Sequence, residues 1–551
     1  MARTQVADAT SLRTAVRAVV FHHLAGIVLA PTVKALADRG IPQRLSETRE
    51  RHTLESLGKA THANAGYLRV AMRLLASAGW VIEERGPDGY GYTVTDAGLR
   101  AFNHAPALYE QVLAFLPHVP RLQHALFEGP DTAIQPLLRH LARKARQRWR
   151  IEAGDDPIGT SLAAQLRTHL DGAIAGPCMV ALARGGVLEQ LQRGPVDMDD
   201  LPGNTASLAC IFDLLATVGW VTAASHRVAL TAAGEYAAQI AASYGVTVSY
   251  VPTLLHLPAL LFGNPRVPRV DEHGHEALVD RAMNVWGSGG AHATYFKRVD
   301  AALVEIFSRP IGQQPSGICD MGCGDGTFLA HLYAVVRERT PRGKMLDTHP
   351  LAIVGADFNK VARRVTSRTL RRADIPHFAV VPGDINRPAS LAGELEKRGI
   401  DSHELLHVRS FLDHNRPYTW LGASARGSRA GESTGAFVYR GALLGADEME
   451  ENLVRHLRRW KPYIGRFGLL VLELHTLPPA TVAGHLDRTP AIAYDATHGY
   501  SDQYLVEAPV FLRCAREAGL VADERCASAF PTPDLATVTL NFFTAATTVD
   551  R

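Results

Sequence analysis

Three glycines stand on alternate positions behind an aspartate in the stretch Ile318–Phe328, which reads ICDMGCGDGTF. Glycine accepts backbone conformations that other residues avoid and lets a ligand approach bare backbone, so Gly322, Gly324 and Gly326 predict a sharp turn. A helical pattern begins at Leu329, and the first turn of a helix offers N–H groups to a ligand. The order strand, glycine turn and helix predicts a small-molecule site at this turn.

Two further acids follow segments that are typical of buried strands. Leu351–Ala356 leads into Asp357, and Ala379–Gly383 leads into Asp384. In a doubly wound parallel sheet, the acid after the second strand meets the ribose hydroxyls of a bound nucleoside. A lone glycine-rich loop is a weak signal, but these two strand ends strengthen it.

The spacing Asp-x-Gly-x-Gly-x-Gly, followed by these two acids, resembles the S-adenosylmethionine (SAM) loop of class I methyltransferases. The resemblance implies an α/β, Rossmann-like methyltransferase domain with SAM as its cofactor. The residues expected to contact SAM are Asp320, Gly322, Gly324, Asp357, Phe358, Asp384, Ile385 and Tyr295.

Chemistry is also concentrated behind the next two predicted strands, Glu404–Phe411 and Gly468–His475. Strands of an open α/β sheet present their carboxyl ends to the ligand, so Asp413, His414 and His475 are expected around one point. One carboxylate and two imidazoles form a set that suits iron and related divalent metals. Alternatively, one histidine is a general base, as in ordinary O-methyltransferases, and the other side chains pack or cap.

Three phrases resemble the mononuclear-iron C-methyltransferase domains of polyketide synthases: Ser410–Tyr418, Arg459–Ile464 and Leu472–His475. The β-carbon methyltransferases of α-keto acids are similar but more distant. The resemblance implies Asp413, His414 and His475 as ligands of iron, or of manganese or cobalt. Asn415 departs from the acid expected in the polyketide domains. A metal that chelates a dicarbonyl would stabilise the enolate from which carbon attacks the methyl group.

Further catalytic candidates lie elsewhere in the second half of the chain. His498, Tyr500 and Gln503 are candidates for the enolising base and for substrate orientation, although a well-bonded polar stretch is an equal alternative. Arg409, on the fourth predicted strand, is a fourth candidate. Residues 282–296, which include His292, suit a lid over cofactor and substrate, and residues 422–435 suit a gating loop or flexible filler.

The first half of the chain is a duplication. The phrase HLAG at His23–Gly26 returns as HLDG at His169–Gly172, and the Gly-Trp-Val at Trp80 returns at Trp220. Each copy reads as helices followed by a short hairpin, which predicts a winged helix. Winged helices often read DNA, but copy two has no Lys or Arg over Asn204–Asp213, so DNA binding is not expected. In small-molecule methyltransferases such modules usually dimerise or roof the active site.

A basic run, Ala142–Arg150, separates the two copies. The plain interpretation is a solvated helix face. The alternative is a docking face for an acidic carrier protein that presents the substrate.

The 551 residues predict two to four domains, and a net charge of +3 gives no case for electrostatic binding of nucleic acid. No signal peptide or membrane-spanning run is expected, so a cytoplasmic protein, possibly a homodimer, is the default. The expected domains are a first winged-helix-like repeat (1–105), a helical linker (106–160), a second repeat (161–240), a connector and lid (241–310) and the methyltransferase domain (311–551).

The sequence thus predicts a SAM-dependent C-methyltransferase that acts on an enolisable carbonyl substrate, either a polyketide-type acyl thioester or a keto acid. Two alternatives stay open: a metal-free O-methyltransferase with a histidine base, and a SAM-binding winged-helix regulator.

Overall fold

The chain forms two compact units in the computed structural model, each built from segments that are distant in sequence. The helical unit comprises residues 1–290, 438–443 and 478–502, and the α/β unit comprises residues 291–437, 444–477 and 503–551. The structure describes residues 2–129, 134–152, 154–224, 226–266, 276–420 and 431–546, without the side chains of residues 2–8 and 291–294.

The α/β unit is built on an eight-stranded sheet with the order β14-β16-β13-β10-β7-β8-β9, to which β15 adds by pairing with β16. The five strands from β13 to β9 are parallel, and β16 runs antiparallel to β13. This confirms the predicted Rossmann-like sheet. The strands are β7 (Gly317–Met321), β8 (Ala352–Asp357), β9 (Phe378–Pro382), β10 (Leu405–Ser410), β13 (Leu469–Leu474), β14 (Leu520–Ala522), β15 (Ser528–Phe530) and β16 (Val538–Ala545).

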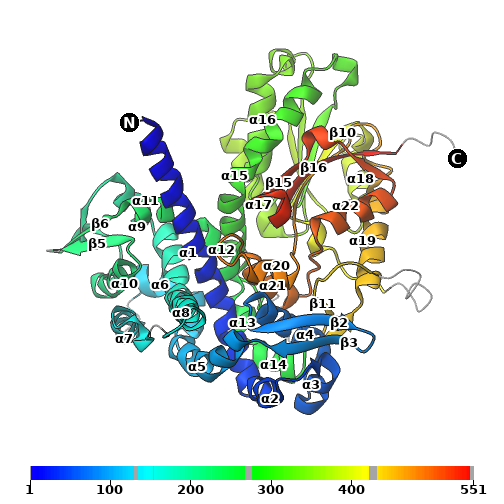
Figure 1. Cartoon of the computed structure of the whole chain (residues 1–551). Helices are drawn as coiled ribbons and strands as arrows, with labels where there is room; N and C mark the ends of the chain where they lie inside the picture. The colour runs from blue at the N-terminus through cyan, green and yellow to red at the C-terminus, as the bar shows by residue number, and fades with distance from the viewer. Residues whose placement is uncertain are drawn as a thin grey trace. The chain divides into compact units, whose positions relative to one another are not determined.

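Helices cover both faces of this sheet (Figure 1). Alternate residues of β7 point to opposite faces: Ile318 joins a core with α15, α16 and α17, whereas Cys319 joins a core with α18 and α19. The helices are α15 (Arg281–Phe307), whose part from residue 291 on belongs to this unit, α16 (Thr327–Arg339), α17 (Lys360–Arg372), α18 (Pro388–Glu396), α19 (Ala446–Trp460) and α22 (Ala508–Glu517).

The strand order reverses between β7 and β10. From β7 the chain continues to β8 and β9 on one side, and then returns to place β10 on the other side, with Leu405 opposite Gly317. Open α/β sheets bind ligands at the carboxyl ends of the strands where such a reversal occurs. The fold therefore places the site at the ends of β7, β8, β9, β10 and β13.

The helical unit contains the predicted duplication. A three-stranded sheet of order β1-β3-β2 with α2 and α4 is matched by a sheet of order β4-β6-β5 with α9 and α10, and the short helix η3 (Met198–Asp200) stands where copy one has α3. The elements of copy one are α2 (Ile41–Thr48), β1 (His52–Thr53), α3 (Leu54–Thr61), α4 (Ala65–Ser77), β2 (Val81–Gly86), β3 (Gly89–Val94) and α5 (Asp96–Leu113). The elements of copy two are α9 (Val187–Arg193), β4 (Val196–Asp197), α10 (Thr205–Thr217), β5 (Val221–Ala224), β6 (Arg227–Leu230) and α11 (Ala232–Gln239).

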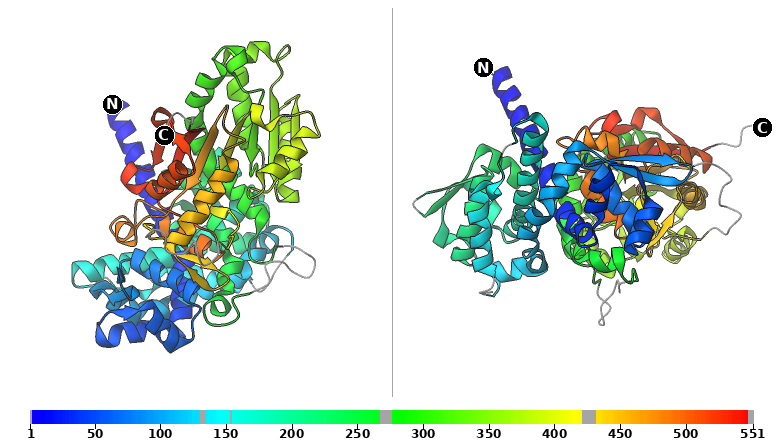
Figure 2. Two further views of the ribbon diagram at one scale, coloured as in Figure 1. Left: turned by 90° about the vertical axis from the view of Figure 1, so that its right-hand side faces the viewer. Right: turned by 60° about the horizontal axis from the view of Figure 1, so that its bottom comes forward.

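The long helices α1 (Ala2–Ala37) and α8 (Pro157–Arg184) lie side by side and join the two copies (Figure 2). A Cβ atom on Gly26 would lie 2.1 Å from the carbonyl oxygen of His169, and one on Gly172 would lie 2.1 Å from the Cα of His23. Both histidines are buried. Only glycine permits so close an approach of the two backbones, which explains why both copies carry it at this position.

Short helices complete the helical unit: α6 (Leu122–Phe127), α7 (Ile134–Arg146), α12 (Ala242–Ser249), α13 (Val251–Leu255), α14 (Leu257–Phe262), α20 (Pro479–Ala483) and α21 (Ala491–Gly499). The predicted helical connector after copy two is confirmed up to α14. The two short strands β11 (Phe437–Tyr439) and β12 (Ala442–Leu444) form a separate pair.

The two arginines of α4, the helix of copy one that would read DNA, are not on the surface. Arg69 and Arg73 of α4 are fully buried and form ion pairs with Glu83 and Asp495, at 2.6 and 2.8 Å. Lys59 is exposed and pairs with Glu55 one turn away. Helix α4 therefore does not present Arg69 or Arg73 to a groove.

One local prediction differs from the structure, and another lies mostly outside the described residues. The Gly-rich stretch expected as a separate lid lies inside α15, because Gly287 lets this helix approach Gly245 of α12 closely, with 2.6 Å from an added Cβ to the Gly245 backbone. Three glycines within four residues lower the helix propensity, so the sequence did not predict a continuous helix here. The predicted gating loop over residues 422–435 lies outside the described residues except for its end from Gly431 on.

By length and composition alone, one segment among the described helices could cross a membrane. It is Ala9–Ala37 of α1, and 78% of its apolar window is buried inside the structure. The segment passes this test by length and composition only, so it does not contradict the expectation that no run spans a membrane. Its burial is typical of a core helix.

Candidate functional site

The glycine loop after β7 has the backbone that its sequence predicts. Gly322, Gly324 and Gly326 have φ angles of 86°, 55° and 80°, in the left-handed region. A Cβ on Gly322 would lie 2.8 Å from the side chain of Leu412. Gly326 precedes the first residue of α16, so the loop delivers the start of that helix to the strand ends.

The acids at the ends of β8 and β9 are tied to this loop or to their own turns. One carboxylate oxygen of Asp357 accepts a bond from the Gly324 N–H at 3.2 Å, and the other accepts from Asn359 at 2.7 Å. Asp384 accepts from the N–H of Asn386. Phe358, beside Asp357, is 82% exposed, which leaves an aromatic face at the site. The structure thus brings these predicted cofactor residues together at the carboxyl ends of the strands.

Asp320 lies at the same end of the sheet and is fully buried near the end of β7. Neither carboxylate oxygen has a hydrogen-bond partner among the described residues. Burial, reinforced by the charges of Asp357 and Asp325, raises the pKa of Asp320 well above its usual range. A buried acceptor without a donor is costly, and a ligand that brings hydroxyl or ammonium donors would satisfy it. The residues present therefore fit SAM.

Tyr295 of α15, another predicted cofactor contact, packs against aromatic rings. Its centroid lies 6.1 Å from that of Phe411 and 5.1 Å from that of Phe530. Phe411 directly follows β10 and has a φ of 56°, which is rare for a bulky residue and marks a strained position. Ile385, also a predicted contact, is buried and accepts a bond from the Trp460 indole through its carbonyl. No motif in the sequence signalled the strain at Phe411.

Glu473 organises the turn after β10. Its side chain lies on β13, fully buried, and it accepts the backbone N–H of Asp413 at 2.6 Å and of His414 at 3.3 Å. Its other oxygen lies 2.6 Å from the Nδ1 of His414. The carboxylate therefore fixes both the short helix η7 (Asp413–Asn415) and the histidine ring that this helix carries.

Glu473 is the functional residue that sequence reasoning missed. The signal was present, because a charged residue in an otherwise apolar, fully buried strand needs a partner. The strand pattern gives its position on the sheet but not which neighbour it meets.

Asp413 is turned into an ion-pair network. One of its oxygens accepts bonds from the Arg409 guanidinium and from the Nε2 of His456, the latter at 2.9 Å. All three side chains are buried, and Arg409 stacks over the ring of Trp460 at 4.2 Å. Burial alone would raise the pKa of Asp413, but the charge of Arg409 and the bond from His456 lower it below its usual range. The carboxylate stays ionised with an arginine as its counter-ion.

His475 has both ring nitrogens engaged. Nδ1 lies 3.1 Å from the Val506 carbonyl, and Nε2 lies 2.7 Å from the Thr539 hydroxyl on β16. Burial lowers the pKa of His475 to about 4, although the charge of Glu473 acts in the other direction. This histidine is a neutral side chain that ties β13 to its neighbours.

Among the described residues, Asp413, His414 and His475 do not bring one ligand atom each to a common point, so their metal role stays a prediction. Each side chain is turned to a different partner: Arg409 and His456, Glu473, and Thr539. In this arrangement the three side chains cannot all bind one metal ion, because both ring nitrogens of His475 are hydrogen-bonded inside the protein, although Asp413 Oδ2 has no partner among the described residues. Strand order put these residues at neighbouring strand ends, but it could not give their rotamers.

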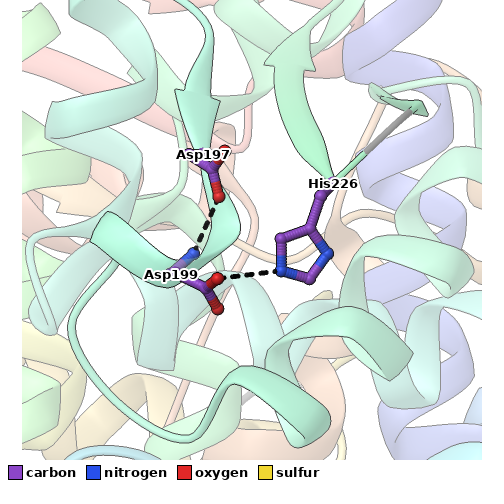
Figure 3. A group of neighbouring side chains, drawn as sticks. All are labelled: Asp197, Asp199 and His226. Atoms are coloured by element: carbon purple, nitrogen blue, oxygen red, sulfur yellow. Dashed lines mark hydrogen bonds and ion pairs between the residues drawn. The ribbon is translucent and has the colours of Figure 1, made fainter.

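Within the described ranges, one other group has metal-like spacing: Asp197, Asp199 and His226 of copy two (Figure 3). All three are exposed. Asp197 accepts the N–H of Asp199 and so caps a short helical turn, and His226 lies 3.2 Å from the Asp199 carboxylate. Ordinary capping accounts for this group.

The remaining catalytic candidates fall in different units. His498 and Tyr500 lie in or just after α21 of the helical unit, where His498 bonds the Tyr494 carbonyl at 2.7 Å and Tyr500 bonds Thr32 at 3.2 Å. Gln503 belongs to the α/β unit. The stretch that suggested a loop is helical, and the catalytic roles of these residues stay predictions. The His292 side chain lies outside the described residues.

Three family models match the chain in order. Residues 16–83 match the AprA N-terminal domain, residues 171–264 match the AprA winged helix domain, and residues 276–541 match the AprA MT2-like domain, a methyltransferase family. Among curated proteins none matches the chain.

Solved structures of methyltransferases are similar in fold. An O-methyltransferase family protein from Burkholderia thailandensis is 12% identical, covers 68% of this chain and 95% of its own, and gives a TM-score of 0.41. CalO1, a methyltransferase in calicheamicin biosynthesis, is 19% identical over 71% of this chain and all of its own, with a TM-score of 0.36. The CurJ carbon methyltransferase is 13% identical over 80% of this chain and 99% of its own, with a TM-score of 0.32.

Proposed function

We propose that this chain, a SAM-dependent methyltransferase whose residues 276–541 belong to the AprA MT2-like family, methylates an enolisable carbon next to a carbonyl group. The substrate class is a polyketide-type acyl thioester or a keto acid of specialised metabolism. SAM, when bound, supplies an electrophilic methyl group on its sulfonium. The loop Gly322–Gly326, Asp357 and Asp384 would hold it, with Asp320 satisfied by its donors.

The observation that carries the proposal is the pair formed by His414 and Glu473. Nδ1 of His414 lies 2.6 Å from the Glu473 carboxylate, which sets Nε2 as the nitrogen that takes up a proton. The carboxylate also stabilises the imidazolium that forms. Since η7 follows β10, the neighbour of β7, this base stands at the strand ends that hold the cofactor loop.

A carbon acceptor is favoured over a hydroxyl by resemblance. The phrases Ser410–Tyr418 and Leu472–His475 are similar to those of polyketide C-methyltransferase domains. Removal of a proton from carbon next to a carbonyl gives an enolate that attacks the methyl group in line. A histidine base serves this reaction and a hydroxyl methylation equally well, so the acceptor needs a direct test.

Deuterium exchange tests the base and the acceptor together. The probes are acetoacetyl and malonyl N-acetylcysteamine thioesters and phenylpyruvate, each incubated in D₂O with the protein and S-adenosylhomocysteine. We expect exchange at the activated carbon of at least one probe, and a loss of roughly 10²–10⁴-fold in the His414→Gln variant. His475→Gln is the matched control and should retain the exchange rate of its folded fraction.

The proposal would be overturned if no probe exchanged and if labelled SAM transferred its methyl group only to a phenolic or alcohol acceptor. A rate in the His414→Gln protein equal to that of wild type would remove His414 as the base while leaving the methyltransferase itself intact.

A metal held by Asp413, His414 and His475 together would need a ring nitrogen of His475, and both of these are hydrogen-bonded to Val506 and Thr539. We therefore assign proton removal to His414 without an ion. Mass spectrometry of extensively dialysed wild-type and His475→Ala proteins measures bound metal. We expect far less than one iron, manganese or cobalt per chain in both. Near-stoichiometric metal in wild type that is lost in the variant would restore the triad.

A further inference from the structure

Helix α7 packs one face inward and presents a basic face outward. Ile134, Leu138, Leu141, Ala142 and Ala145 are buried, and the helix lies against α10 of copy two. The outer face carries Arg139, Arg143 and Arg146, which recur at three- and four-residue spacing and are exposed. The spacing places the three guanidinium groups in one stripe along the helix.

Almost no negative charge neutralises this stripe. Six cations and no acid occur between Arg139 and Arg150. Arg146 pairs with Asp213 at 2.6 Å, whereas no carboxylate among the described residues pairs with Arg139 or Arg143. A run of cations without neighbouring acids produces a local positive field, although the net charge of the chain is only +3.

The stripe borders a hollow. A cavity of about 650 Å³ is lined by Pro136, Arg139, His140, Arg143, Arg146 and Gln147. All its lining side chains are polar or basic apart from one proline, so it suits an anionic group rather than an apolar one.

The turn after α7 continues the stripe in a fixed geometry. Arg148, Trp149 and Arg150 all have left-handed φ angles, of 49°, 57° and 55°. The Trp149 ring is buried and its indole N–H donates to Asp171 at 2.7 Å, which anchors the turn. Arg148 and Arg150 stay exposed. Three consecutive residues in a costly conformation are kept only where the surrounding structure enforces them.

The chemistry of the face selects one kind of partner. A membrane-surface helix inserts its apolar face, but the apolar face of α7 is buried in the protein. Single-stranded nucleic acid binds by stacking on aromatic rings, but Trp149, the aromatic side chain of this segment, is buried. From Arg139 to Arg146 the stripe covers about two helical turns, roughly 10 Å, which a short helical segment of a partner can span.

We propose that the outer face of α7 and the turn Arg148–Arg150 form a docking surface for an acidic helix of a partner protein. Charge complementarity supplies the attraction, and the hollow receives carboxylate side chains between Arg139, Arg143 and Arg146. This surface is independent of the methyl-transfer chemistry, so its failure and the failure of the proposed reaction are distinguishable.

Binding of a synthetic helical peptide with glutamates along one face tests the proposal. Calorimetry or fluorescence anisotropy with the whole chain at physiological salt should give saturable binding that weakens as salt rises. The Arg139→Glu/Arg143→Glu/Arg146→Glu variant should bind at least roughly tenfold more weakly. Arg139→Gln/Arg143→Gln, which keeps the ion pair of Arg146 with Asp213, serves if the charge-reversed protein does not fold.

Helix α17 offers a matched control. It also carries six cations and no acid, and Arg364→Glu/Arg368→Glu/Arg371→Glu reverses as much charge on its exposed side. We expect this variant to bind the peptide as wild type does. The proposal is overturned if the α17 variant loses affinity equally, if the α7 variants lose none, or if a single-stranded oligonucleotide displaces the peptide at equal charge concentration.

Discussion

The two winged-helix copies share a core but use one equivalent position in opposite ways. Arg73 and Asp213 each stand seven residues before the tryptophan that follows the repeated helix, Trp80 or Trp220. Arg73 pairs with Asp495 of α21, and both are buried. Asp213 pairs with Arg146 of α7, and the two side chains are 45% and 59% exposed. The duplicated helix thus holds a covering helix in both copies, with the charges exchanged.

The comparison explains where cations are available in this molecule. In copy one, Arg69 and Arg73 are buried in ion pairs, so the helix that would read DNA does not present them at its surface. In copy two, the helix has no cation, and the positive charge lies on the outer face of α7. Duplication preserved the packing and left the covering surfaces free to diverge.

The largest effect is expected where the copies meet. Gly26→Leu and Gly172→Leu each drive a side chain into the backbone of the opposite long helix, so each should cost about 4 kcal/mol or more, or prevent folding. Thermal unfolding measures the loss. Gly393→Ala on α18, where an added Cβ meets nothing, is the control and should be neutral or stabilising. Equal tolerance at Gly26 and Gly393 would refute the close crossing.

The exchanged ion pairs should differ in strength. Arg73→Met leaves Asp495 buried without its partner and should cost about 3–5 kcal/mol. Asp213→Ala breaks an exposed pair and should cost less than about 1 kcal/mol. Chemical denaturation of both variants measures the difference. Similar losses at the two positions would show that exposure does not separate the copies.

A pH dependence should follow from the paired histidines. His23 lies 2.7 Å from the Tyr244 hydroxyl, and His169 lies 2.7 Å from the Tyr109 hydroxyl. Burial lowers the pKa of His23 to about 3 and that of His169 well below its usual range. Below about pH 6.5 these histidines take up protons in the unfolded chain but not in the folded one. The free energy of unfolding should therefore decrease as the pH is lowered, by about 2 kcal/mol per histidine between pH 7 and pH 5.

Unfolding free energies of wild type and of the His23→Gln and His169→Gln variants across this range measure the slope. Each variant should lose its share of the pH dependence. A variant whose slope matches that of wild type would remove its histidine from this account.

The sequence by itself determined the glycine loop and the succession of the first strands along the chain. Asp320 and the three glycines are local signals, because the backbone conformation they need follows from residue type. The alternation of apolar segments and acids gave β8 and β9 within a residue or two, and the repeated HLAG and Gly-Trp-Val phrases gave the duplication. These features depend on neighbours along the chain.

Only the tertiary structure decided what the site residues contact. Asp413, His414 and His475 stand at neighbouring strand ends, as predicted. Asp413, however, is hydrogen-bonded to Arg409 and His456, and His475 is hydrogen-bonded to Thr539. Glu473 became the partner of His414 because β13 pairs with β10, a contact between residues 59 apart. Rotamers and long-range partners depend on packing among distant segments, which no local pattern records. The burial of Arg69 and Arg73 could not be predicted for the same reason, because it depends on their contacts with Glu83 and Asp495.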